Sequence, residues 1–150
     1  MRLVALALAL LFAATAAFAA DTSLNGIRIV RPQLVLPPPT AMSAAAYMTI
    51  INEGTAPNLL IAVETDAAMH AMLHETVIGE DGIARMFELP PLIVAPGETF
   101  SFVGGVAHIM LMHLNDGYKV GDQVPFLLTF DVAGEIPVMF EVVATAPTGK

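Results

Sequence analysis

The sequence contains no cysteine, and this absence removes several classes of function at once. A secreted domain without thiols has no disulfides and must rely on its hydrophobic core for stability. Thiolate metal sites and thiol catalysis are excluded. A blue-copper electron-transfer centre is excluded on the same ground, because such a site needs a cysteine ligand.

Basic residues and catalytic motifs are also scarce. Six Lys and Arg stand against 14 Asp and Glu, which gives a formal net charge of −8. So acidic a chain is a poor nucleic-acid binder, whereas its surface weakly attracts cations. There are only three serines, and no G-x-S-x-G, H-E-x-x-H or Gly-rich phosphate loop occurs. The sequence therefore does not predict an enzyme.

The N-terminus has the pattern of a secretory signal peptide. A positive start is followed by the apolar run Leu3–Phe12 and by an A-x-A motif at Ala17–Ala19. We expect a signal peptide over residues 1–20, a single domain over 21–150 and a periplasmic location. The alternative, a membrane anchor, is disfavoured because the apolar run is shorter than the ~20 residues that a span needs. We expect no stable membrane insertion after cleavage.

The remainder predicts an all-β domain. Gly, Pro, Asn or Asp recurs every 8–12 residues between short runs rich in β-formers, which is typical of a sandwich or barrel. The expected strands are Gly26–Arg31, Ala45–Asn52, Leu59–Glu64, His70–Ile78, Ile83–Glu88, Leu92–Val94, Thr99–Val103, Ala107–Leu114, Gln123–Asp131 and Ile136–Val143.

Histidine and methionine are interleaved in one segment. All four histidines and five methionines lie within residues 69–113. Either residue type alone would mean little, because methionine is a common core filler and single histidines are often structural. Together they suggest a copper site, because neutral thioether sulfur favours Cu(I) over harder ions and imidazole also binds copper.

Strand geometry selects candidate ligands within this segment. In a strand over Ala107–Leu114, His108 and Met110 share a face and lie roughly 6.6 Å apart along the chain. His74 and Met86 share a face only if their hairpin turns through a three-residue loop, Glu80–Gly82, with Gly82 left-handed. His74 then lies opposite Glu88, with Met86 as a diagonal neighbour. A two-residue turn would put His74 and Met86 on opposite faces.

The pattern His74-Glu75, ten residues, Met86, twenty-one residues, His108-x-Met110 resembles the signature of the periplasmic copper chaperones of the PCuAC family. Similar text surrounds it, including Gly104-Gly105 before the HxM motif. The resemblance implies a cupredoxin-like Greek-key β-barrel. It also implies a Cu(I) ion bound by His74, Met86, His108 and Met110.

The resemblance further implies delivery of copper to the binuclear copper centre of cytochrome c oxidase, directly or through another copper chaperone. A copper storage or resistance protein would share the ligands and is the alternative. A copper oxidase or monooxygenase stays conceivable. The C-terminal tail lacks the His and Met residues that give some members a second, Cu(II) site.

The other histidines and methionines of the segment have several possible roles. His70 and Met72 share a face with His74 if the strand extends that far, so they are either auxiliary ligands or ordinary exposed residues. Met112 is expected to form a hydrophobic wall of the site. His113 points the opposite way and is expected to be structural or exposed. For the four main ligands, the alternative is core packing with one or two surface histidines.

Overall fold

The computed structural model describes residues 21–148, and within them it is built of strands alone. The predicted all-β, cupredoxin-like class is confirmed. The predicted signal peptide, residues 1–20, lies outside the described residues. Between residues 21 and 148 no helix has the length and apolar character needed to cross a membrane.

Ten of the eleven strands coincide with the predicted ones. The strands are β1 (Thr22–Leu24), β2 (Ile27–Val35), β3 (Ser43–Asn52), β4 (Asn58–Glu64), β5 (Ala68–Ile78), β6 (Ala84–Glu88), β7 (Leu92–Val94), β8 (Thr99–Ser101), β9 (Ala107–Leu114), β10 (Gln123–Phe130) and β11 (Gly134–Val143).

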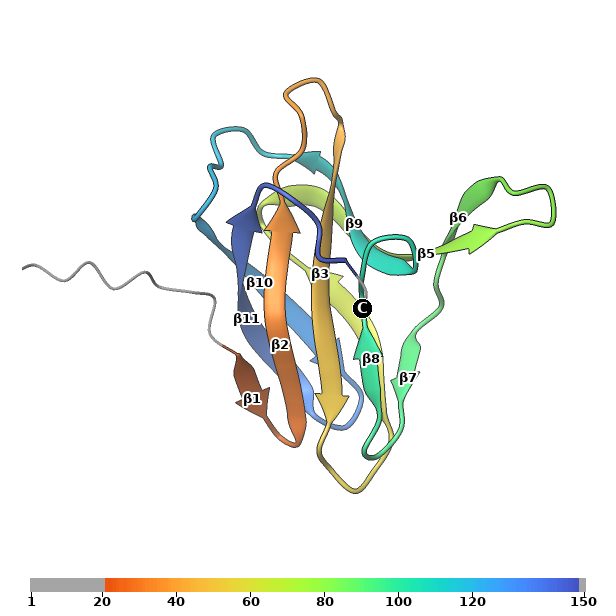
Figure 1. The fold of residues 1–150 in the computed structure, drawn as a ribbon. Coiled ribbons are helices and arrows are strands. Elements are labelled where there is room, and N and C mark those ends of the chain that lie inside the picture. The colour runs from red at the N-terminus through yellow and green to blue at the C-terminus, as the bar shows by residue number, and fades with distance from the viewer. Residues whose placement is uncertain (1–20, 149–150) are drawn as a thin grey trace, which may run out of the picture.

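All the strands belong to one curled sheet in the order β6-β5-β9-β3-β2-β11-β10-β4-β7, with β1 beside β2 and β8 beside β3 (Figure 1). Among the strands of residues 21–148, only β2 and β11 pair in parallel. Because β6 and β7 end the path without pairing to each other, the sheet is a half-barrel that stays open on one side. This open side lies next to the histidine-bearing strand β5.

The core lies inside the curl, where alternate residues of the long strands point. Ile29, Ile50 and Ile109 are fully buried, and the rings of Phe126 and Phe140 pack with centroids 4.1 Å apart. Inward apolar residues alternate with outward ones because successive side chains of a strand leave opposite faces. The buried Ile109 therefore places its neighbours on the outer face of β9.

The prediction was wrong at the first strands. β1 was missed, because three residues carry too little pattern to be recognised. The strand expected to end at Arg31 continues to Val35. It passes Pro32 through a bulge, where the pairing with β3 shifts and Arg31 has a φ of 49°. A bulge accommodates the proline, which cannot donate a ladder hydrogen bond.

Candidate metal site

The candidate ligands lie on the outer face of three adjacent strands, β6, β5 and β9. Residues directly opposite each other in antiparallel strands share a face, so each pairing forms one row across it. One row contains Glu88, His74 and His108. Along β5 and β9 this face carries three successive pairs of thioether or imidazole side chains: His70 with Met112, Met72 with Met110, and His74 with His108.

The two imidazole rings lie close enough to share one metal ion. Their centroids are 5.8 Å apart and their planes are inclined by 59°. A metal about 2.0 Å from a ring nitrogen lies about 3 Å from the ring centroid, so rings that share an ion have centroids at most about 6 Å apart. The observed spacing fits a bent N–metal–N arrangement.

Burial and charge keep His108 suited to metal binding. Its side chain is 8% exposed, and burial lowers its pKa, helped by the nearby imidazole of His74. A lowered pKa favours the neutral ring, which is the form that binds metal. The Nδ1 atom of His74 is buried and has no hydrogen-bond partner among the described residues. Such an orphan nitrogen is costly unless something binds it, and a metal ion would do so.

Tyr47 of β3 lies near His108 on the side opposite His74, because β9 lies between β3 and β5. This position of Tyr47 was not anticipated from the sequence. Its ring centroid is 6.3 Å from that of His108, and it is itself 8% exposed. Burial raises the pKa of its phenol. Strand alternation in β3 could have placed Tyr47 on the face of Ala45, which lies opposite Met110. Its partner strand, however, could not be read from the sequence.

The two candidate sulfur ligands lie on opposite sides of the histidine row. Met110 follows His108 on the same face and lies opposite Met72. Met86 lies opposite Thr76, one row from His74 in the other direction, and is 62% exposed. The structure thus brings three predicted ligands into adjacent positions. It places Met86 on the same face, out on the projecting β5–β6 arm (Figure 1).

The hairpin register predicted for a shared face is confirmed. His74 lies opposite Glu88, and the amide of Gly79 donates to the carbonyl of Ile83 at 3.0 Å. The loop between them therefore has three residues, and Gly82 within it has a φ of 75°. The alternative two-residue turn is excluded, and with it a Met86 on the wrong face.

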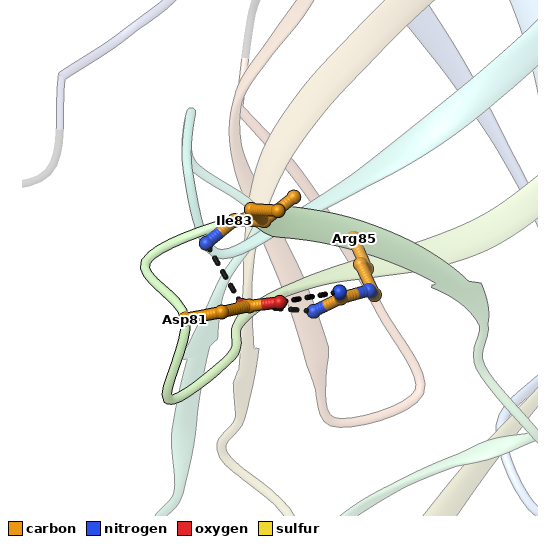
Figure 2. A network of polar contacts seen from close by, with 3 residues as sticks. All are labelled: Asp81, Ile83 and Arg85. Atoms are coloured by element: carbon orange, nitrogen blue, oxygen red, sulfur yellow. Dashed lines mark hydrogen bonds and ion pairs between the residues drawn. The ribbon is translucent and has the colours of Figure 1, made fainter.

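Asp81 fastens this loop (Figure 2). Its Oδ1 accepts from the amide of Ile83 at 3.1 Å and from Nη1 of Arg85 at 3.1 Å, and its Oδ2 accepts from Nη2 at 2.6 Å. The Arg85 guanidinium, followed by the Ile83 amide, lowers the pKa of the Asp81 carboxyl. Paired hydrogen bonds of this kind fix geometry as well as charge. They hold the loop conformation that sets the position of Met86.

The remaining histidines and methionines of the segment divide between the two faces. His70 lies opposite Met112 on the ligand face, where Met112 is half-buried and His70 exposed. His113 is exposed, as predicted, and has a φ of 54°. Among the described residues no group of three or more His, Cys, Asp or Glu could hold a metal. The side chains that lie beside the histidine pair and could add a further soft ligand are the thioethers of Met110 and Met86.

Comparison with known proteins shows the family of the chain. Residues 27–142 match the family model described as "lipoprotein LpqE-like". The word lipoprotein is part of the family's description and is not a statement about this chain, which contains no cysteine. No protein of curated function matches the sequence closely.

Several solved structures share the fold. The copper-bound PCuAC domain from PmoF2 is 21% identical with a TM-score of 0.72, covering 84% of this chain and 99% of that one. The apo PCuAC domain from PmoF1 is 22% identical with a TM-score of 0.73, covering 84% and 100%. Cu(I)-bound DR1885 from Deinococcus radiodurans is 28% identical with a TM-score of 0.64, covering 89% and 87%.

Proposed function

The chain belongs to the LpqE-like family and has the PCuAC fold, and on this basis we propose that it is a periplasmic Cu(I) metallochaperone. It binds one Cu(I) ion through His74, Met86, His108 and Met110. The observation that carries the proposal is the pairing of His74 with His108, with ring centroids 5.8 Å apart and Met110 beside them. The Cu(I) form of DR1885 supports the choice of metal.

The donor set explains why Cu(I) is preferred. Two thioethers and two neutral imidazoles are soft or intermediate ligands without charge, which suit a monovalent soft ion better than Zn(II). Thioethers also cannot be lost to disulfide formation in an oxidising compartment. Neutral ligands favour release, because no ligand anion has to be separated from the cation.

Met86 completes the site from the arm. It is exposed, and its row on the hairpin is next to the row of His74 on the same face. Closing over the histidine pair would bring its sulfur to the ion, and opening again would expose the ion to a recipient. A ligand on this arm would thus link binding to transfer.

Exposed apolar side chains on the arm favour delivery over storage. Val77, Ile78, Ile83 and Phe87 are between 43% and 69% exposed. Apolar groups gathered at one projecting element mark a surface for another protein. The recipient we propose is the copper subunit of cytochrome c oxidase, reached directly or through another copper chaperone, and the protein itself catalyses no reaction.

Anaerobic competition with a chromogenic Cu(I) chelator tests the metal site. We expect His108→Ala and Met110→Ala each to weaken Cu(I) binding by at least the 10–100-fold that even an outer-shell change costs a metal site. Met139→Leu, at an exposed methionine of β11, is the matched control and should bind as the original chain does. Unchanged affinity in both ligand variants would reject the site.

Copper transfer tests the delivery step. The Cu(I)-loaded chain is mixed with the apo copper domain of the oxidase subunit, and copper in each protein is measured after separation. Transfer faster than dissociation into free chelator supports direct delivery. A chain that binds Cu(I) but gives it up only at the rate of free dissociation would be a storage or resistance protein instead.

A further inference from the structure

The row of soft side chains does not end at the proposed site. Beyond His74 and His108, β5 and β9 pair Met72 with Met110 and then His70 with Met112. The proposed site uses Met110 but leaves His70, Met72 and Met112 without a role. We call these three residues the outer triad. One imidazole and two thioethers on one face of two neighbouring strands are the observation to be explained.

The strand register makes the outer triad one cluster. His70 and Met112 are directly opposite, so their Cβ atoms are about 5 Å apart, and Met72 is two residues along β5 on the same face. Leu73 and Leu111, which alternate with them, are buried in the core. The triad therefore faces outward, away from the apolar interior that would otherwise explain two methionines.

The triad is also accessible at a free strand edge. β6 pairs with β5 only from His74 onward, so residues 70–72 have β9 on one side and no paired strand on the other. A cavity of about 940 Å³ opens there, lined in part by His70 and Met72. Its walls include the carboxylates of Glu64, Asp66 and Glu88. Negative charge around such a cavity raises the local concentration of cations.

We infer that His70, Met72 and Met112 form a second Cu(I)-binding position. Two thioethers and one imidazole give a neutral three-coordinate set selective for a soft monovalent ion. Zn(II) is not expected, because the described residues offer no cluster of three His, Cys, Asp or Glu for it. The inference takes its metal from the proposed function, but its ligands are different residues.

The two positions are arranged for exchange of one ion. The row of His70 lies four residues from the row of His74, roughly 13 Å along the strand, and the Met72–Met110 row lies midway. A Cu(I) ion can pass between them by exchanging one thioether for the next. Copper stays Cu(I) throughout, so no electron or proton donor is needed. The outer triad, beside the acidic cavity, is the point at which copper enters or leaves.

Copper stoichiometry tests this inference. The full chain is titrated anaerobically with Cu(I) against chelators of graded affinity. We expect two equivalents, the second at least about tenfold weaker because it has one ligand fewer. The double variant His70→Ala/Met112→Leu should retain only the tight equivalent. The variant His108→Ala/Met110→Leu should lose the tight equivalent and retain a weak one.

The control removes one histidine and one methionine from the same two strands. Met69→Leu/His113→Asn changes residues that neighbour the triad but alternate with it. Asparagine is used at position 113 because it tolerates the left-handed conformation found there. This variant should keep both equivalents. Circular dichroism confirms that each variant is folded.

A second readout identifies the ligands without mutation. Ag(I), a soft ion that does not change oxidation state, is added to protein carrying ¹³C-methyl methionine. The methyl resonances of Met86 and Met110 should shift during the first equivalent, and those of Met72 and Met112 during the second.

Each outcome separates this inference from the proposed function. One equivalent in the original chain, or two in the His70→Ala/Met112→Leu variant, overturns the second position and leaves the first intact. No copper bound by the original chain overturns both. Loss of the second equivalent in the Met69→Leu/His113→Asn control overturns the assignment to these ligands.

Discussion

His74 and His108 lie directly opposite each other on β5 and β9, with ring centroids 5.8 Å apart. Because the sheet fixes both strands, this half of the site is organised before any metal binds. The thioether of Met110 follows on the same face. The remaining ligand that we propose, Met86, is on the β5–β6 arm, which projects from the sheet (Figure 1). The proposed site thus combines two imidazoles on paired strands with a sulfur on this arm.

The lowered pKa of His108 predicts a pH dependence of folding in the metal-free protein. Unfolded histidine titrates near 6.5, and burial holds the pKa of folded His108 below that value. Between these two values the unfolded state binds more protons, so the free energy of unfolding falls as pH falls through this window. The loss from one proton cannot exceed about 1.4 kcal/mol per pH unit.

Urea denaturation at pH 7.5 and pH 5.5 measures this effect. His108→Gln, which is neutral throughout, should lose less stability over the same interval than the original chain does. Carboxylates contribute equally to both proteins and cancel in the difference. Identical losses in the two proteins would mean that His108 titrates normally.

The three-residue loop predicts what a one-residue deletion does. Removing Glu80 leaves the two-residue turn Asp81-Gly82 between Gly79 and Ile83, a loop length that β-hairpins favour, so these two residues stay paired and the register of β6 is retained. Met86 then stays on the face of His74. Cu(I) affinity should therefore stay near that of the original chain, whereas Met86→Leu should lower it.

A double-mutant comparison makes the deletion test specific. Adding Met86→Leu to the Glu80 deletion should lower Cu(I) affinity as much as Met86→Leu does in the original chain, because the two changes act independently. A large loss from the deletion alone, with no further loss from Met86→Leu, would show that the shortened loop shifts the register and removes Met86 from the face of His74.

The contacts of Asp81 are expected to stabilise the arm locally and to contribute little to the stability of the whole domain. Its contacts with Arg85 and the Ile83 amide are exposed, and exposed ion pairs add little to overall stability. Asp81→Ala should therefore leave the denaturation midpoint nearly unchanged but speed amide hydrogen exchange at Gly79 and Ile83. Equal exchange rates in the two proteins would show that the backbone hydrogen bonds alone hold the loop.

Sequence reasoning reached the parts of the site that depend on local geometry. Alternation placed His108 with Met110, and hairpin geometry made a shared face for His74 and Met86 conditional on a three-residue loop, which the structure contains. Neither argument could show that β5 pairs with β9, because alternation fixes a residue's face but not its neighbour across the sheet. The direct pairing of His74 with His108, the cover of Tyr47 and the Met72–Met110 row all follow from that long-range register.

Prediction of the fold from the sequence was limited in the same way. Short β-rich runs bounded by turn residues predicted ten strands, but the order in which they pair is decided by packing between distant segments. The bulge at Arg31 shows the other limit. The strand was expected to end at Arg31, whereas a local shift in pairing lets β2 pass Pro32 and continue to Val35.

Replacing Asn52 is expected to destabilise the fold strongly, although this residue lies far from the proposed metal site. Its side chain is fully buried on β3, and Nδ2 donates to the carbonyls of Ala56 at 2.8 Å and Val94 at 2.9 Å. Its Oδ1 accepts from the amide of Gly54 at 3.0 Å. Asn52→Ala leaves these buried backbone groups without partners. We expect it to lower the free energy of unfolding by about 2–4 kcal/mol.

Asn115→Ala is the matched control for this buried amide. Asn115 also donates through Nδ2 to a backbone carbonyl, that of Asp66 at 2.9 Å, but the contact is exposed and water can replace it. Its loss should cost less than about 1 kcal/mol. Denaturation by urea compares the two variants at pH 7.5. Similar losses of stability in the two variants would contradict the prediction. They would show that burial does not make the hydrogen bonds of Asn52 contribute more than those of an exposed asparagine.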